Sequence, residues 1–426
     1  MNLPITYPKQ EVRRSFTLGI VNGVVFQFAT SLIDPPLILT WFVSQLTSSN
    51  LPIGLVAPLQ SAGWLLPQIF VSAHIQRMQR KMPSYALAAV VRVLCWMLLA
   101  TTVWLVDDPR WLLASFFILY TIANMGAGLG GLAFFDVIAK TIPARQRGKF
   151  FAWRQLLGGL LGLAAAWIAT LILNQPGLAF PRGHAVLIAL YCVVTLPAMA
   201  SFIMIHEPPG PTVAQPVTSR QQLRRAGQLL RDDGVFCRYM AVRLSLGLAG
   251  IALPFYGMYA KNVLGAPGGM VGVYIAVRVG AQLLSTLPWG RMSDRYGNRL
   301  VLQLSNLGRG LTALLALALV SLVSLFHLQG TWLPYLALPL FILDGALLPT
   351  QVLAGGNFLI ELVPDAERPL YMGSANTLLG VIVLLSGLGG LMVDLVGFAG
   401  LFTLTLCLCL LAFSWALKLP EPRKAD

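Results

Sequence analysis

Among the ionisable residues inside long apolar segments, where charged groups are costly, three are candidates for function: Asp34, Arg278 and Asp344. A charge near the centre of a membrane-spanning helix costs at least about 2.5 to 3.5 kcal/mol, so each needs a partner, water or a function. A carboxyl group in such a place can carry a proton, and an arginine can bind an anion. The three residues therefore predict proton transfer or anion binding within a membrane.

Asp34 is the first candidate for proton transfer. It lies beside Pro35 and Pro36 and follows Gln27 and Ser31 at spacings of about one helical turn. In a continuous helix this spacing places Gln27, Ser31 and Asp34 on one face. We expect that face to line a wet cavity, where Asp34 takes up and releases a proton as substrate moves. The alternative is an acid that is simply hydrated near the outer end of its helix.

Two polar stripes occur at corresponding positions of the chain. Gln60, Trp64 and Gln68 recur every four residues, and a later apolar segment carries Arg278 and Gln282 at matching positions. Matched stripes favour a shared central cavity that contains the pathway. The alternative is that these side chains form hydrogen bonds that hold helices together.

Arg278 must find acceptors because a guanidinium group stays charged. An acidic substrate could supply them, and so could Asp344, in an ion pair that braces the fold or acts as a gate. Asn124 and Gln351 complete the set of residues that we predict along the substrate or proton pathway.

Four other charged residues are expected to have structural roles. Arg92 and Arg309 occupy similar positions in two segments that we expect at the periphery, where they would brace the fold or reach toward the membrane surface. Asp136 and Lys140 fall at the end of an apolar segment, where salt bridges or helix capping are expected.

The elements that position these residues are predicted to be membrane helices. Of the 426 residues, 57% are hydrophobic and 11% are charged, and the mean hydropathy is +0.73. A soluble chain carries about 25% charged residues. Apolar runs of about 20 residues recur along the chain. The sequence therefore predicts an all-α polytopic membrane protein with twelve transmembrane helices, at residues 17–43, 51–73, 84–106, 111–139, 150–173, 184–205, 235–260, 270–289, 300–326, 332–360, 372–394 and 398–417.

The distribution of basic residues predicts the orientation. Most of the 30 Lys and Arg residues lie at the termini or in even-numbered connections, whereas the opposite loops carry only Arg110, Arg182 and Lys261. Because cytoplasmic loops are enriched in basic residues, we expect both termini in the cytoplasm. The same dispersal explains the formal net charge of +14 without a nucleic-acid partner. Short loops favour a bacterial cytoplasmic (inner) membrane.

An internal repeat divides the predicted helices into two sets of six. Residues 111–159 align without a gap on residues 332–380. We therefore predict two pseudo-symmetric six-helix bundles, at residues 1–205 and 235–426, joined by a polar cytoplasmic linker at 206–234. Repeats of this kind occur in secondary transporters, with substrate held near the bilayer midplane.

One short motif carries a family resemblance. Gly290, Asp294, Arg295, Gly297 and Arg299 resemble the G-x-x-x-D-R-x-G-x-R/K loop motif of the major facilitator superfamily. Together with twelve helices and a repeat, the motif implies that fold over the whole chain. The resemblance also implies that the loop acts as a conformational latch.

The first half and the antiporter signatures depart from this pattern. The matching loop at residues 72–81 has Gln76 in place of the acid. Residues 124–128 and 155–162 lack the arginine and the Gly-Pro pair of drug antiporters in the family. The resemblance therefore implies the superfamily and no particular subfamily.

The predicted function is secondary active transport of a small solute by alternating access. No phosphate-binding loop of an ATPase is present in the sequence, so an ion gradient is expected to drive transport, most simply a proton gradient. Candidate lining residues are mainly apolar or aromatic, which favours export. The alternatives are proton-coupled uptake and a non-transporting relative that binds a lipid, a pigment or a partner protein. We expect a monomer without cofactor or metal, and no enzyme, because no catalytic constellation occurs at a coherent depth.

Overall fold

The computed structural model describes residues 9–210, 219–351, 356–363 and 368–421, and every regular element in these ranges is a helix. The α-helices are α1 (Lys9–Leu32), α2 (Thr40–Leu46), α3 (Asn50–Gln76), α4 (Met82–Leu105), α5 (Pro109–Thr141), α6 (Ala144–Leu173), α7 (Arg182–Ile203), α8 (Ser219–Asp232), α9 (Gly234–Ala249), α10 (Leu253–Asn262), α11 (Met270–Tyr296), α12 (Asn298–Phe326), α13 (Leu338–Thr350), α14 (Phe358–Leu362), α15 (Arg368–Leu385) and α16 (Gly389–Leu417). Short turns of other helical types are η1 (Pro35–Leu39), η2 (Gly250–Ala252), η3 (Leu333–Ala337) and η5 (Ser386–Leu388).

Ten segments of the described residues are long and apolar enough to cross a membrane. One of them, Tyr371–Leu417, has 47 residues and a break at Gly397, whose φ of 69° is not helical. At about 1.5 Å per residue it could cover about 70 Å, more than two crossings of a hydrocarbon core about 30 Å thick. The 27 residues of α3 supply a further crossing. The predicted all-helical membrane fold is confirmed. The ten segments, a second crossing within Tyr371–Leu417 and the crossing by α3 agree with the predicted twelve helices.

The first predicted helix, at 17–43, is not continuous. The α-helix α1 ends at Leu32, and the π-helical turn η1 and the short helix α2 follow it. Pro35 and Pro36 cause the break, because proline has no N–H to donate and its ring clashes with the preceding helical turn. The predicted helix at 332–360 is likewise divided, into η3, α13 and α14.

The chain forms two compact units. Unit 1 contains residues 1–33 and 66–218, and unit 2 contains residues 34–65 and 219–426. Residues 34–65 therefore pack with the C-terminal part of the chain, although the sequence repeat assigns them to the first half. Part of the predicted linker, at 211–218, lies outside the described residues, and the next part forms α8. The division into two six-helix bundles stays a prediction.

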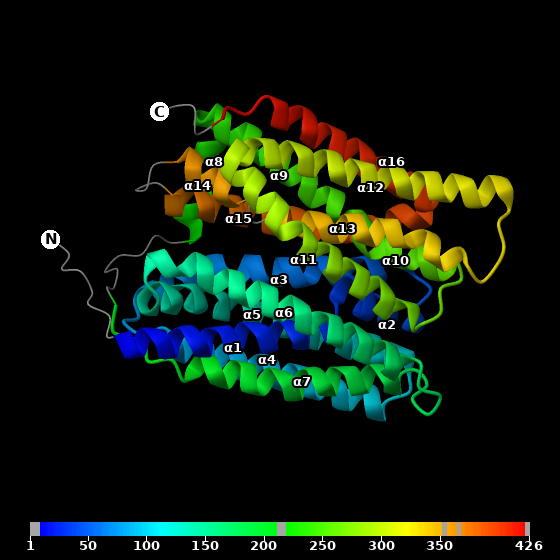
Figure 1. Ribbon diagram of the computed structural model, residues 1–426, viewed down its shortest axis with the longest axis horizontal. Helices are drawn as coiled ribbons and strands as arrows, with labels where there is room; N and C mark the ends of the chain where they lie inside the picture. Colours follow the sequence, from blue (N-terminus) through cyan, green and yellow to red (C-terminus); the bar gives the residue numbers. More distant parts are fainter. Residues whose placement is uncertain (1–8, 211–218, 352–355, 364–367, 422–426) are drawn as a thin grey trace. The chain divides into compact units, whose positions relative to one another are not determined.

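Unit 1 is built on α1, α4, α5, α6 and α7, which pack side by side (Figure 1). The closest helix pairs are α4 with α5 and α1 with α6. Aromatic rings fill its core, among them Phe150 and Phe202, which are fully buried. The faces that these helices turn toward one another are thus largely apolar.

Unit 2 is built mainly on α9, α11, α12, α13 and α16 (Figure 1). The pairs α11 with α13, α12 with α16, and α9 with α16 make its main interfaces. Phe236, Tyr239 and Phe358 are buried in a core cluster, where Tyr239 stacks on Phe358 with the ring centroids 5.6 Å apart. This packing fixes the helices that carry the candidate site.

Candidate functional site

Three charged side chains of unit 2 form one network. The Nε of Arg278 donates a hydrogen bond to Oδ2 of Asp344 at 2.6 Å, and its Nη1 lies 3.0 Å from Oδ2 of Asp34. The side chains of Arg278, Asp34 and Asp344 are 12%, 14% and 9% exposed. The ion pair between Arg278 and Asp344, one of the two alternatives for Arg278, is present. Asp34 joins it, which the sequence pattern did not indicate.

The charges of this network do not cancel. Two ionised carboxylates and one guanidinium leave a net charge of −1, and Arg278 cannot lose its proton at ordinary pH. One proton on either acid makes the network neutral. A buried charge is costly when no opposite charge compensates it. A proton removes the net charge of this network, whereas a proton taken up by a balanced ion pair would leave an uncompensated charge.

Asp34 occupies a helix N-terminus rather than the middle of a helix. Its Oδ1 accepts a hydrogen bond from the backbone N–H of Leu37 at 3.2 Å, and this caps η1. Gln27 and Ser31 remain in α1, where Ser31 Oγ donates to the carbonyl of Gln27 at 2.9 Å. The predicted polar face of Gln27, Ser31 and Asp34 is therefore interrupted by the end of α1 at Leu32.

A glycine allows the two helices of the network to approach closely. A Cβ atom added at Gly345 on α13 would overlap the backbone carbonyl of Arg278 on α11. Only glycine lacks that atom. The close approach places Asp344, the neighbour of Gly345, within direct hydrogen-bonding distance of Arg278.

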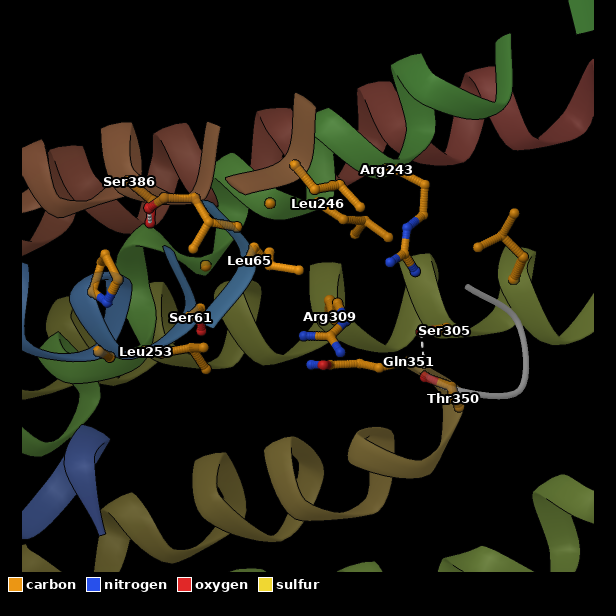
Figure 2. A pocket seen from close by; sticks show the side chains of 17 residues that line it. Ser61, Leu65, Arg243, Leu246, Leu253, Ser305, Arg309, Thr350, Gln351 and Ser386 are labelled. Carbon is orange, nitrogen blue, oxygen red and sulfur yellow. Dashed lines mark hydrogen bonds between the residues drawn. The ribbon is translucent and has the colours of Figure 1, made fainter. Parts of the chain in front are cut away.

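A cavity of about 270 Å³ lies within unit 2. Its walls come from α3, α9, α12, α15 and the end of α13, and from nearby turns (Figure 2). The polar residues that line it are Ser61, Arg243, Ser305, Arg309, Thr350, Gln351 and Ser386. Its remaining lining residues are apolar or glycine, so it can hold a small solute that has both polar and apolar parts.

The cavity uses a different face of α3 from the predicted one. Ala57, Ser61 and Leu65 line it at four-residue spacing. The predicted row of Gln60, Trp64 and Gln68 is partly buried but is not among the lining residues. The two rows differ by three positions, and at 3.6 residues per turn this offset separates them by about 60° around the helix.

Two arginines lie on the cavity wall, Arg243 on α9 and Arg309 on α12. Figure 2 shows both side chains reaching into the cavity, with the amide of Gln351 beside Arg309. Among the described residues neither guanidinium group forms an ion pair, and Nε of Arg243 is buried without a hydrogen-bond acceptor. The cavity is therefore cationic. Arg309 lines this cavity, which its expected position at the periphery did not indicate.

A smaller cavity of about 20 Å³ lies beside both the larger cavity and the charged network. It is lined by Arg309 and Asp344, together with Tyr256 and other residues of unit 2. Arg309 thus contacts both the larger cavity and the space beside the charged network. Asp344 and Arg309 line the same small cavity, so a change of charge at Asp344 alters the electrostatic potential at Arg309.

The other predicted pathway residues are dispersed. Asn124 is buried in unit 1, and its Nδ2 donates to the carbonyl of Tyr120 at 2.8 Å. Gln282 lies on α11, one turn beyond Arg278, and its backbone carbonyl accepts the hydroxyl of Thr286 at 2.7 Å. Of the predicted polar residues without charge, only Gln351 is placed in the cavity of unit 2.

Most of the motif at 290–299 lies in helices and not in a loop. Gly290, Asp294 and Arg295 belong to α11, and Gly297, with φ of 86°, is the single residue between α11 and α12. Such a positive φ favours glycine. Arg299 donates to the carbonyl of Leu417 at 2.9 Å. The motif thus makes a tight turn and joins it to the end of α16, whereas its role as a latch stays a prediction.

The described residues contain no group of three or more His, Cys, Asp or Glu side chains that could hold a metal ion. The functional groups of the site are therefore carboxylates, guanidinium groups, hydroxyls and one amide. This set suits proton exchange and anion binding. Sequence reasoning missed Arg243 and Arg309, although the rule that singled out Arg278, a charge inside an apolar segment, applies to both.

Comparison with known protein families finds a match over part of the chain. Residues 234–426 match the model of the Major Facilitator Superfamily. A search of curated protein sequences finds no significant match.

Solved structures share the fold over nearly the whole chain. The D-xylose-proton symporter has a TM-score of 0.74 at 17% identity, and the match covers 97% of this chain and 99% of that one. A mutant of the nucleoside transporter NupG has a TM-score of 0.70 at 14% identity, with 95% and 98% covered. The xylose transporter XylE from E. coli, in a partially occluded inward open conformation, has a TM-score of 0.69 at 17% identity, with 97% and 99% covered.

The fold of the whole chain is therefore similar to that of solved membrane transporters. Within this fold, residues 234–426, somewhat less than half of the chain, match the model of the Major Facilitator Superfamily.

Proposed function

We propose that the chain is a proton-coupled secondary active transporter that moves a small solute by alternating access. The network of Asp34, Arg278 and Asp344 carries the proposal. It holds two acids on one arginine inside membrane-spanning segments, and one proton brings its charge to zero. Ionisable residues within membrane helices commonly mark ion and substrate pathways.

Coupling requires that the proton and the solute influence each other's binding. Arg309 supplies a physical connection, because it lines both the cavity and the space beside Asp344. Protonation of an acid in the network changes the field at Arg309, and solute bound at Arg309 changes the field at the acid. In this proposal the cavity residues Arg309 and Gln351 hold solute, and the network holds the proton.

Two directions of transport follow from different observations. The apolar and aromatic residues near the site favour export in exchange for protons, as the sequence predicts. The cationic cavity favours proton-coupled uptake as the second candidate, because a proton offsets the negative charge of a bound anion. A similar fold in a protein described as a D-xylose-proton symporter also supports this second candidate. We place the chain in the bacterial cytoplasmic membrane, with both termini in the cytoplasm.

Proton movement in proteoliposomes tests the proposal. An imposed pH gradient is combined with a neutral sugar, a nucleoside and small carboxylates, in wild type and in Asp34→Asn. We expect at least one solute to drive proton flux in wild type, and Asp34→Asn to reduce that flux to the level of empty liposomes. The sign of solute movement relative to proton movement separates export from uptake.

Asp394→Asn is the matched control. Asp394 is an exposed acid of unit 2 that accepts a hydrogen bond from Asn50 at 2.6 Å, away from the network. This variant should keep wild-type flux. Full flux in Asp34→Asn would move the coupling site to Asp344 or elsewhere, and silence across the panel would favour a non-transporting protein that binds a lipid, a pigment or a partner.

A further inference from the structure

We propose that the cavity of unit 2 binds a small amphipathic organic anion, a carboxylate or a phosphate ester with an apolar body, through Arg243 and Arg309. The inference names the substrate class of the proposed transporter and rests on that function for its role in transport. The binding itself can be measured without transport.

The charge of the cavity is the first argument. Two guanidinium groups line it, and none of the described lining residues is acidic. Neither guanidinium forms an ion pair among the described residues. A guanidinium group stays charged in a protein, so an anion that enters the cavity gains a favourable interaction with both arginines. An oxyanion is the group that an arginine binds best, through two parallel hydrogen bonds.

Several of the hydroxyl groups that line the cavity already form hydrogen bonds within the protein. Thr350 Oγ1 lies 2.7 Å from Ser305 Oγ and 2.6 Å from the carbonyl of Leu347. Ser386 Oγ donates to the carbonyl of Val383 at 2.6 Å. The two arginines and the amide of Gln351 are therefore the main donors for a ligand. A neutral polyol would leave both guanidinium charges without a counter-ion, whereas an anion would not.

Unit 1 shows how this protein compensates an arginine that has a structural role. Arg92 donates to the hydroxyl of Tyr191 at 2.7 Å and lies over the ring of Phe26, with its Cζ 4.7 Å from the centroid. Arg154 donates to Asn22 Oδ1 at 3.1 Å and lies over the ring of Phe134. Each guanidinium group is thus held by a polar acceptor and an aromatic face.

The arginines of the unit 2 cavity form no such contacts among the described residues, and Nε of Arg243 is buried without an acceptor. A buried donor that forms no hydrogen bond is costly, so a ligand that supplies the acceptor gains that free energy on binding. The contrast with unit 1 indicates that Arg243 and Arg309 are kept for a ligand.

The rest of the cavity defines the body of that ligand. The apolar lining comprises Ala57, Pro58, Leu65, Leu246, Leu253, Leu302, Leu379 and Val383. Drug-sized ligands occupy pockets of about 300 to 1,000 Å³, so a cavity of about 270 Å³ suits a smaller molecule. An anion with one acidic group and a short hydrocarbon or aromatic body can pair with the two arginines and pack against the apolar lining.

Equilibrium binding to the full-length protein tests the inference. Benzoate, hexanoate, phenyl phosphate and hexyl phosphate are titrated calorimetrically against the protein in phosphatidylcholine nanodiscs, beside the neutral benzamide and hexanamide. We expect at least one anion to bind and its neutral analogue not to bind. Arg243→Gln and Arg309→Gln should each weaken binding about tenfold or more, because each removes a charge-assisted hydrogen bond.

Arg224→Gln is the matched control, since Arg224 is an exposed arginine of α8 outside the cavity. It should bind the anion as wild type does. Arg243→Lys retains the charge and should recover part of the affinity lost in Arg243→Gln, which separates a direct contact from misfolding.

Two kinds of result would overturn the inference. One is the absence of binding by every anion of the panel, or equal binding by the double variant Arg243→Gln, Arg309→Gln. The other is thermal stabilisation by phosphatidylglycerol that depends on both arginines while no soluble anion binds, which would make the occupant a lipid headgroup. Anion binding without proton flux would leave the site intact and refute the transport proposal. Proton-coupled flux of a neutral solute without anion binding would refute the anion site and leave the transport proposal intact.

Discussion

The two units treat their charged residues in opposite ways. In unit 1, Lys81, Asp136, Lys140 and Glu207 form a balanced cluster of two cations and two anions. Lys140 Nζ lies 2.6 Å from Asp136 and 2.8 Å from Glu207, and Lys81 Nζ lies 2.5 Å from Asp136. In unit 2, two acids share Arg278, and their charges do not cancel.

The positions of the two groups differ as much as their charges. Asp136 and Lys140 belong to the last turns of α5, and the carboxylate of Glu207 accepts the backbone N–H groups of Lys81 and Met82 at the start of α4. An anion at a helix N-terminus satisfies donors that the helix cannot, and is favoured by the helix dipole. The cluster of unit 1 therefore fastens helix ends, as expected for Asp136 and Lys140.

The difference teaches how to recognise a charged group with a function. A balanced cluster at helix ends lowers the energy of one structure and gains nothing from a proton. An unequal network within a membrane segment changes its net charge when it gains one. The comparison predicts that substitutions in the network of unit 2 affect both stability and transport, whereas those in the cluster of unit 1 affect stability alone.

The largest effect is expected for Arg278→Met. It leaves two buried carboxylates without their cation, and removing one member of a buried ionic group costs about 3 to 5 kcal/mol of folding free energy. Thermal unfolding in detergent measures the loss. The triple variant Asp34→Asn, Arg278→Met, Asp344→Asn should recover much of the stability while remaining inactive. A stable Arg278→Met protein would contradict the network.

A smaller effect is expected for Gly345→Ala. The added methyl group would overlap the carbonyl of Arg278, and overpacking of this kind costs about 1 to 3 kcal/mol. Separation of α11 from α13 should also reduce proton-coupled flux. Gly280→Ala, on α11 with no atom within 4 Å of the new carbon, is the control and should be neutral or stabilising. Equal melting temperatures for the two variants would argue against a close approach at Gly345.

The smallest effect is expected for Lys81→Met in unit 1. The side chain of Asp136 is 26% exposed and keeps Lys140 as a partner, so the folding free energy should fall by less than about 1 kcal/mol. Lys140→Met should cost more, since Lys140 serves both Asp136 and Glu207. Proton-coupled flux should survive Lys81→Met in liposomes. Complete loss of flux in that variant would show that the cluster of unit 1 takes part in coupling.

Most of the helical architecture could be predicted from the sequence because membrane segments have a local signature. Length and apolarity of each segment were sufficient, since a bilayer requires about 20 apolar residues and satisfied backbone groups. The break at Asp34 was less predictable. Two consecutive prolines indicated a disturbance, but not that η1 would begin there with Asp34 as its cap.

The candidate site was predicted only in part, because sequence gives spacing along a helix and not the identity of its neighbours. The pair of Arg278 and Asp344 could be anticipated from the need of a buried arginine for an acid. The cavity face of α3 could not, because a rotation of about 60° exchanges the row of Gln60 for the row of Ser61. Arg243 and Arg309 were visible as buried charges, but nothing local showed that they share a cavity.

The sequence by itself determined the membrane class, the helical crossings and the presence of charges within them, because all three follow from the solvent that the chain must enter. The tertiary structure alone decided which charges meet. Asp34 and Arg278 are 244 positions apart, and Arg243 and Arg309 lie on separate helices. Only the packing of α11 on α13 at Gly345, and of the helices around the cavity, turns these separate residues into a network that can hold a proton and a cavity that is cationic.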